Sequence, residues 1–189
     1  MSFSSLISEI ITLDQNQLSQ DEYRYVVDLI LEKRGANVLV FGVGNDSRLW
    51  LAANRKGRTL FLEDSSTWLD KVIRQVPAIE VTLVRYGTRR SQWREMLEGP
   101  PSDLEMKLPD EVWAIAWDII FVDAPWGFND ICPGRMKSIY TASKIASCRA
   151  GIDVIVHDCD RELERAYCDR FLSSYILIRE FQRTRHYRT

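Results

Sequence analysis

Three ionisable residues suited to catalysis or metal binding follow apolar runs in the second half of the chain. Asp123 lies near the end of the stretch 117–125, and His157 and Asp158 end the stretch 151–158. Carboxylates and imidazoles act as general bases, and paired carboxylates can hold a hard divalent cation. We therefore treat Asp123, His157 and Asp158 as candidate catalytic residues, and Asp123 and Asp158 as candidate metal ligands. The alternatives are a carboxylate that caps the next segment and a neutral imidazole at the edge of a sheet.

A glycine-containing turn lies in the first half of the chain. The apolar run Val38–Phe41 leads directly into Gly42 and Gly44, and three polar residues follow. This pattern is typical of a buried parallel strand and a tight turn, where a ligand can lie against bare main chain. The alternative is that the glycines only make the turn. We expect the cofactor-binding residues of this segment to be Gly42, Gly44, Asn45, Asp46 and Ser47, with Asp46 or Ser47 capping the next helix.

Glu63 lies about twenty residues past the glycines, which is where an acid accepts hydrogen bonds from the ribose of an adenosine cofactor. It ends the second apolar run, 58–64, and Asp64 beside it leaves the choice of residue open. The third glycine of the dinucleotide fingerprint is missing, so a nicotinamide dehydrogenase ranks lowest among the possible functions.

Candidate acceptor-binding residues follow the 117–125 stretch. Arg135 comes after Gly134 in a loop, where a guanidinium could pair with a carboxylate or phosphate in bidentate fashion. Trp126, together with Phe128, could form an aromatic platform for a sugar, or could simply pack the loop. The arginines between residues 85 and 94 are better explained as a solvated helix face.

Apolar runs and helical periodicity alternate along the chain. We expect helices over 2–12, 21–34, 66–75, 88–98, 136–148 and 161–171, and strands over 37–41, 58–64, 79–84, 117–125 and 151–158. Segments 175–178 and 182–187 could pair as an antiparallel hairpin, and 99–112 is expected to be a surface insertion. Alternating strands and helices predict an α/β fold with a mostly parallel sheet covered on both faces. Right-handed crossovers then bring the candidate residues to one edge of the sheet.

Composition narrows the class of protein. With 189 residues the chain is expected to form a single domain, 1–189, with N-terminal helices over 1–34 and a Rossmann-like core over 35–189. A net charge of −2 makes nucleic acid an unlikely partner, and no apolar stretch is long enough to span a membrane. The N-terminus does not resemble a signal peptide. The four cysteines lack C-x-x-C spacing, which favours reduced thiols over a zinc site.

Five motifs in order resemble those of a plant polysaccharide-biosynthesis family, which holds the glucuronoxylan 4-O-methyltransferases and the irregular-xylem xylan proteins. They are 40–47, 57–64, 117–125, 133–142 and 156–158, and the similarity runs from about residue 21 to the end. The resemblance implies a Rossmann-like methyltransferase fold, S-adenosylmethionine as cofactor, and activity associated with a divalent metal. We also expect Asp123 to be among the cofactor-binding residues. In that family the acceptor is the 4-hydroxyl of glucuronic acid on xylan.

The plant enzymes of that family carry an N-terminal Golgi membrane anchor, whereas this chain begins with an expected helix. We expect a cytoplasmic location if the chain is complete, and the Golgi lumen if an anchor has been removed. The expected activity is O-methylation of a hydroxyl of a sugar or uronic acid, with a small-molecule or glycan acceptor. The alternatives are a non-catalytic scaffold, which would bind cofactor without turnover, and an RNA methyltransferase, which would show salt-sensitive RNA binding.

Overall fold

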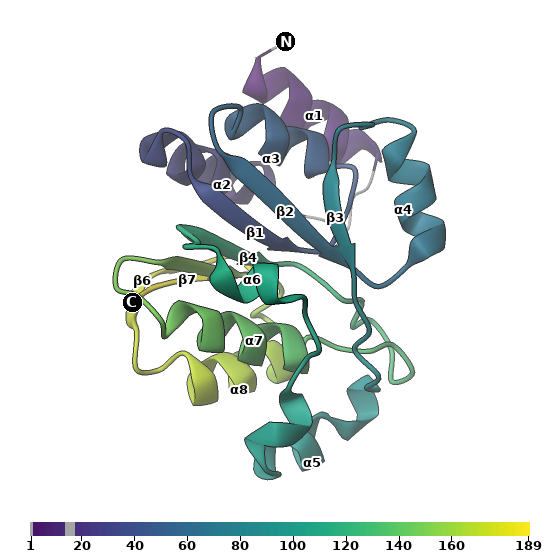
Figure 1. Ribbon diagram of the computed structural model, residues 1–189, viewed down its shortest axis with the longest axis vertical. Helices are drawn as coiled ribbons and strands as arrows, with labels where there is room; N and C mark the ends of the chain where they lie inside the picture. Colours follow the sequence, from purple (N-terminus) through teal and green to yellow (C-terminus); the bar gives the residue numbers. More distant parts are fainter. Residues whose placement is uncertain (1, 14–17) are drawn as a thin grey trace.

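The computed structural model describes residues 2–13 and 18–189, which form a seven-stranded sheet with helices on both faces (Figure 1). The strands are β1 (Asn37–Phe41), β2 (Arg58–Glu63), β3 (Glu80–Leu83), β4 (Ile119–Val122), β5 (Asp153–Val156), β6 (Ile176–Phe181) and β7 (Thr184–Arg188). The helices are α1 (Phe3–Leu13), α2 (Gln20–Lys33), α3 (Ser47–Ala53), α4 (Ser66–Ile73), α5 (Trp93–Glu98), α6 (Asp110–Ala114), α7 (Met136–Ala146) and α8 (Glu162–Phe171). Two short 3-10 helices, η1 (Arg90–Gln92) and η2 (Pro101–Leu104), flank α5.

The strand order is β3-β2-β1-β4-β5-β7-β6. Strands β1 to β5 are parallel, whereas β7 runs antiparallel to β5 and pairs with β6 in the expected C-terminal hairpin. The chain reverses its direction of travel across the sheet between β1 and β4, so a crevice opens beyond the carboxyl ends of these strands. The predicted α/β, mostly parallel fold is therefore confirmed.

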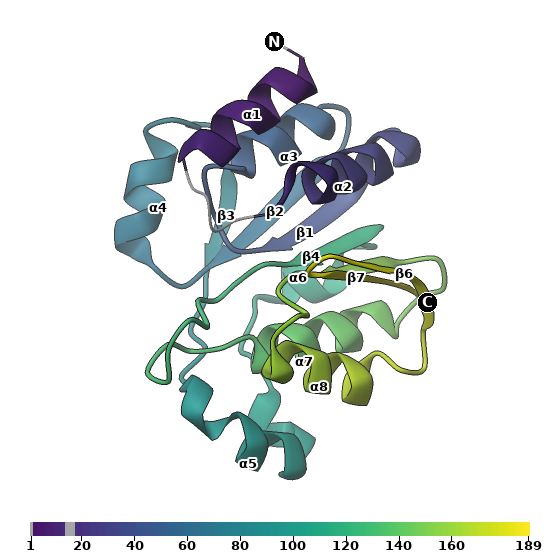
Figure 2. The same ribbon diagram turned by 180° about the vertical axis from the view of Figure 1, so that it is seen from behind.

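The helices form two layers, one on each face of the sheet (Figures 1 and 2). Helices α1 to α4 cover one face, and α6 to α8 cover the other, where α5 lies farther from the sheet and packs against α7 and α8. The central strands are apolar on both faces because each is buried from both sides. In β1, for example, Val38 and Val40 pack toward α1–α4, whereas Leu39 and Phe41 pack toward α5–α8.

Segment 99–112, expected to be a surface insertion, instead contributes to the core. Leu104, Met106 and Val112 are buried in the layer that contains α7 and α8. Their apolar side chains are spaced too irregularly for a helix or strand pattern, so only the tertiary packing reveals their burial. Among the described residues, none of the helices combines the length and apolar character that crossing a bilayer requires.

A buried glutamate joins the N-terminal helices to the C-terminal hairpin. Ser19 and Glu22 form a capping box at the start of α2, in which the backbone N–H of Ser19 donates to the Glu22 carboxylate at 2.9 Å. The other Glu22 oxygen accepts the Thr184 hydroxyl at 2.7 Å and the backbone N–H of Arg183 at 3.0 Å. Because these groups are buried or half-buried, the carboxylate satisfies donors that have little access to bulk water.

We therefore expect Glu22→Ala to lower the free energy of unfolding by about 2–4 kcal/mol, because it removes the cap and leaves buried donors unpaired. Urea denaturation would measure the change. Asp21→Ala is the matched control, since Asp21 is the exposed neighbour in the same helical turn. Asp21→Ala should lower the free energy of unfolding by less than about 1 kcal/mol. Equal losses for both variants would contradict the anchoring role of Glu22.

Candidate active site

The turn after β1 is shaped by its glycines and held by the neighbouring strand. Gly42 has φ +110°, a conformation that L-residues with side chains rarely adopt. The backbone N–H of Val43 donates to the Glu63 carboxylate at 2.8 Å, and the N–H of Gly44 donates to the Ser47 hydroxyl at 3.0 Å. The predicted glycine turn and the acid at the end of β2 are thus parts of one hydrogen-bonded unit.

Glu63 is buried, and its carboxylate accepts hydrogen bonds from the backbone of two loops. Besides Val43, it accepts hydrogen bonds from the backbone N–H groups of Ser65 at 2.8 Å and Asp64 at 3.1 Å. Burial raises the pKa of Glu63, and these hydrogen bonds oppose the shift. One lone pair of the oxygen that accepts from Val43 has no protein donor among the described residues, so Glu63 can still accept one bond from a ligand.

Asp46 holds the N-cap position of α3 but does not cap the helix through its side chain. The expected cap is wrong because the backbone is already helical at Asp46, with φ −83° and ψ −11°. The Ser47 hydroxyl accepts from the turn instead, as described above. Asp46 lines the cavity next to the turn, where burial and the nearby Asp123 carboxylate raise the pKa of Asp46 to about 7.

The cavity opens at the carboxyl edge of the sheet, between the β1 turn and the segment after β4. Its acidic lining consists of Asp46, Glu63, Asp64 and Asp123. Gly42 and Gly44 also line it, whereas Asn45 and Ser47, which were predicted to contact the cofactor, do not. Ser47 is buried behind the turn, which it supports.

Aromatic residues form much of the remaining lining. Trp126, predicted from the sequence, lies at the cavity together with Trp50 and Trp68, which were not assigned to the site. The indole N–H of Trp68 donates to the carbonyl of Val43 and so also holds the glycine turn. The only signal in the sequence is that Trp68 closely follows the acid at the end of β2.

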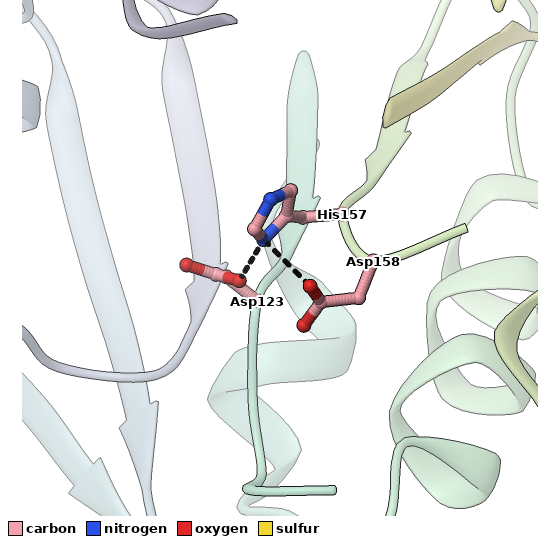
Figure 3. Close-up of side chains that lie close together, drawn as sticks. All are labelled: Asp123, His157 and Asp158. Atoms are coloured by element: carbon pink, nitrogen blue, oxygen red, sulfur yellow. Dashed lines mark hydrogen bonds and ion pairs between the residues drawn. The ribbon is translucent and has the colours of Figure 1, made fainter. Parts of the chain in front are cut away.

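Asp123, His157 and Asp158 come together as predicted, with ligand atoms within 4.8 Å of one another (Figure 3). His157 Nδ1 lies 2.7 Å from Asp123 Oδ1 and 3.8 Å from Asp158 Oδ1. Asp158 has φ +63°, and this backbone turn follows His157 directly at the end of β5. Only Asp123 lines the cavity, whereas His157 and Asp158 are buried behind it.

Arg135 is buried between the two carboxylates. Its Nη2 atom lies 2.7 Å from Asp158 Oδ2 and 3.0 Å from Asp123 Oδ1. The same guanidinium donates to the backbone carbonyls of His157 and Asp123, both at 2.7 Å. The expectation that Arg135 pairs with a carboxylate of the acceptor is not supported by this position, because the protein itself surrounds the guanidinium.

The cluster does not fit a divalent cation in this arrangement. Asp158 pairs with three guanidinium groups, those of Arg135, Arg161 and Arg183. Asp123 Oδ1 is occupied by His157 and Arg135, which leaves only Asp123 Oδ2 without a protein donor among the described residues. Calcium and magnesium require about six oxygen ligands. One free carboxylate oxygen next to the buried Arg135 guanidinium does not provide such a site.

Solved structures with the same fold include S-adenosylmethionine-dependent enzymes. The O-methyltransferase of Bacillus cereus, solved with S-adenosylhomocysteine, matches with a TM-score of 0.57 and 15% identity, covering 98% of this chain and 91% of that one. TomG of Streptomyces achromogenes, solved with S-adenosylmethionine, matches with a TM-score of 0.55 and 14% identity, covering 100% and 88%. At such low identity these matches show the fold, which is the Rossmann-like methyltransferase fold.

Sequence relatives come from Arabidopsis thaliana. Glucuronoxylan 4-O-methyltransferase 1 is 37% identical over 174 residues, covering 82% of this chain and 62% of the relative. Arabinogalactan O-methyltransferase 2 is 31% identical, covering 90% and 66%, and Protein IRREGULAR XYLEM 15 is 31% identical, covering 92% and 61%. The chain spans 62% to 65% of the lengths of the three glucuronoxylan 4-O-methyltransferases that it matches.

The family model described as IRX15/IRX15L/GXM matches residues 21–103 and 100–187. These segments include the glycine turn, the acid at the end of β2 and the Asp123–His157–Asp158 cluster. The resemblance noted in the sequence is thereby confirmed, and this chain belongs to the IRX15/IRX15L/GXM family.

Proposed function

We propose that this protein is an S-adenosylmethionine-dependent O-methyltransferase that acts on a hydroxyl group of a sugar or uronic acid. The observation that carries the proposal is the acidic cavity, where the glycine turn and Glu63 face Asp123 across the carboxyl edge of a methyltransferase fold. Family relatives named as glucuronoxylan and arabinogalactan O-methyltransferases support a glycan as the acceptor.

The glycine turn fits a ligand that lies against bare main chain. A Cβ atom built on Gly42 would lie 2.7 Å from the Ala124 Cβ atom, and one on Gly44 would lie 2.6 Å from Asp46 Oδ1. Side chains at these positions would therefore fill the space beside the cavity. We infer that Gly42 and Gly44 line the cofactor site and that Glu63, with Asp64 beside it, accepts hydrogen bonds from the ribose.

The charge of the cavity also fits the cofactor. S-adenosylmethionine would supply an electrophilic methyl group on a positively charged sulfonium, and its methionine part, which also carries an α-ammonium group and an α-carboxylate, has a net positive charge. Carboxylates in a half-buried cavity favour cations because the local dielectric is lower than that of water. Asp46 and Asp123 are the two acids that the segments after β1 and β4 contribute. We infer that they hold the positively charged end of the cofactor.

Asp123 is also the best-placed group to receive the proton of an acceptor hydroxyl. Burial raises the pKa of Asp123, but His157 and Arg135 lower it more, so the carboxylate is ionised at neutral pH. With Oδ1 occupied, Oδ2 remains to accept a hydrogen bond from the acceptor. We infer that His157 and Asp158 orient Asp123 rather than contact the acceptor, because both are buried outside the cavity lining.

The loop after β4 offers an aromatic surface for the acceptor. Trp126 and Phe128 are 65% and 67% exposed, with ring centroids 5.8 Å apart. Backbone hydrogen bonds brace this loop, including Arg90 N–H to the Cys132 carbonyl at 2.6 Å. A preformed aromatic surface can cover the apolar C–H face of a pyranose ring and remove it from water. We infer that Trp126 contacts the acceptor sugar.

We expect Gly42→Ala to weaken S-adenosylhomocysteine binding by at least about tenfold, since the new methyl group meets Ala124 and the turn must shift. Isothermal titration calorimetry would measure the affinity. Gly151→Ala is the matched control, because Gly151 also has a positive φ, +83°, but a Cβ there meets nothing within 4 Å. Its affinity should stay within twofold of wild type, and an equal loss in both variants would indicate a general folding defect instead.

We expect S-adenosylmethionine to bind more tightly as pH rises from 6 to 8. Asp46, with a pKa of about 7, is largely protonated below this range and ionised above it, and only the ionised form attracts a cation. Calorimetry across this pH range would test the effect. Asp46→Asn should flatten the profile, and the rise should be smaller for S-adenosylhomocysteine, which lacks the sulfonium charge. A wild-type affinity independent of pH would contradict this role of Asp46.

We expect Asp123→Asn to lower kcat for methyl transfer to a glucuronic-acid-bearing xylo-oligosaccharide by about 10²–10³, as for loss of a general base. Transfer of radiolabelled methyl groups would measure the rate. Asp160→Asn, at an exposed position two residues after Asp158, should retain wild-type activity. Wild-type protein that binds S-adenosylhomocysteine but transfers no methyl group would support a non-catalytic scaffold over the enzyme proposed here.

A further inference from the structure

One guanidinium of the buried cluster reaches the surface next to the aromatic loop. Arg161 precedes α8, and its Nη1 atom lies 3.0 Å from Asp158 Oδ2. Its side chain is 32% exposed, compared with 6% for that of Arg135, which pairs with the same carboxylate oxygen. Arg161 therefore combines a fixed position with donors that a ligand can reach.

Gly127 brings the aromatic loop against this arginine. A Cβ atom built on Gly127 would lie 3.5 Å from Arg161 Nη1 and 3.4 Å from Glu164 Oε1. The two neighbours of Gly127 in the chain are Trp126, which lines the cavity, and Phe128. The guanidinium thus lies beside the loop that carries the aromatic surface. The first residues of this loop border the cavity.

The nearby acids do not fully neutralise the charge of Arg161. Asp158 also pairs with Arg183 at 3.2 Å and with Arg135, which Asp123 contacts as well, so three guanidinium groups share two carboxylates. Glu164 is 3.9 Å from Arg161, beyond hydrogen-bonding distance, and is buried. Neither Glu164 oxygen has a hydrogen-bond partner among the described residues, and burial raises the pKa of Glu164, which weakens it as a counter-ion. The outer edge of the cluster is therefore cationic, whereas the cavity beside it is acidic.

We propose that Arg161 binds the carboxylate of an anionic sugar acceptor whose ring stacks on Trp126 and Phe128, so that Arg161 determines the preference for uronic acids over neutral sugars. The inference rests on the proposed function, because it concerns the acceptor side of the same site. It assigns to Arg161 the role that the sequence had suggested for Arg135. A planar guanidinium suits this role because it can hold a carboxylate through two parallel N–H bonds.

A matched pair of ligands tests the proposal. One is a xylo-oligosaccharide bearing a single glucuronic acid, and the other is the same molecule with the carboxyl group reduced to a primary alcohol. We expect wild-type protein to bind the acid about tenfold more tightly than the alcohol, as one accessible charge-assisted contact would give. Calorimetry would measure both affinities, so no catalytic turnover is required.

Three variants complete the experiment. Arg161→Gln should reduce the preference for the acid to less than twofold, and Arg161→Lys should give an intermediate value because it keeps the charge but not the planar fork. Arg170→Gln is the control, since Arg170 is exposed at the other end of α8. It should keep the full preference. Thermal unfolding of each variant would identify any that fail to fold, and Arg161→Lys decides the question if Arg161→Gln is one of them.

The proposal is overturned if wild-type protein does not prefer the acid, or if the folded Arg161 variants keep the wild-type preference. In the second case Arg161 serves only as a counter-ion of Asp158. Each titration is run with and without S-adenosylhomocysteine. A failure to bind that compound counts against the proposed methyltransferase activity, while the preference for the uronic acid is still measured independently.

Discussion

The bridge that Arg135 forms between Asp123 and Asp158 is the interaction on which the rest of the site depends. The guanidinium contacts both carboxylates and two backbone carbonyls, at the ends of β4 and β5. It therefore joins two neighbouring strands through groups that are buried from water. Loss of one partner from such a buried pair typically costs about 3–5 kcal/mol, because an unpaired charge remains. Asp123 can face the cavity in a defined orientation because its other oxygen is held from behind.

The same bridge separates two surfaces of opposite charge. On the cavity side, the Asp123 carboxylate lies close enough to Asp46 to disfavour ionisation of Asp46, which a cationic ligand would relieve. On the outer side, Asp158 is shared among several arginines, and Arg161 remains partly exposed. A positively charged cofactor and a negatively charged acceptor would thus meet complementary surfaces on either side of one buried network.

The arginines also determine whether the carboxylates can bind a metal ion. Paired acids at adjacent strand ends would suit a divalent cation if they were solvated and otherwise unpaired. Here a guanidinium already occupies the space between them, so Asp123 and Asp158 act as partners of a permanent cation. Two methyltransferases of the same fold share only 14% to 15% identity with this chain. A common fold therefore does not imply a common arrangement of charges at the ends of the strands.

The sequence by itself determined the strands, their mostly parallel arrangement, the C-terminal hairpin and the family. It also indicated that Gly42, Glu63, Asp123, His157 and Asp158 lie at one edge of the sheet. These features follow from local patterns, because apolar runs and glycine turns predict the same local structure in different proteins. Only the tertiary structure decided that Arg135 is buried and that Asp46 faces the cavity instead of capping α3. The same holds for Trp68, which lines the cavity, and for segment 99–112, which packs in the core. The physical reason is that burial and pairing of a side chain depend on neighbours distant in sequence, which no local pattern specifies.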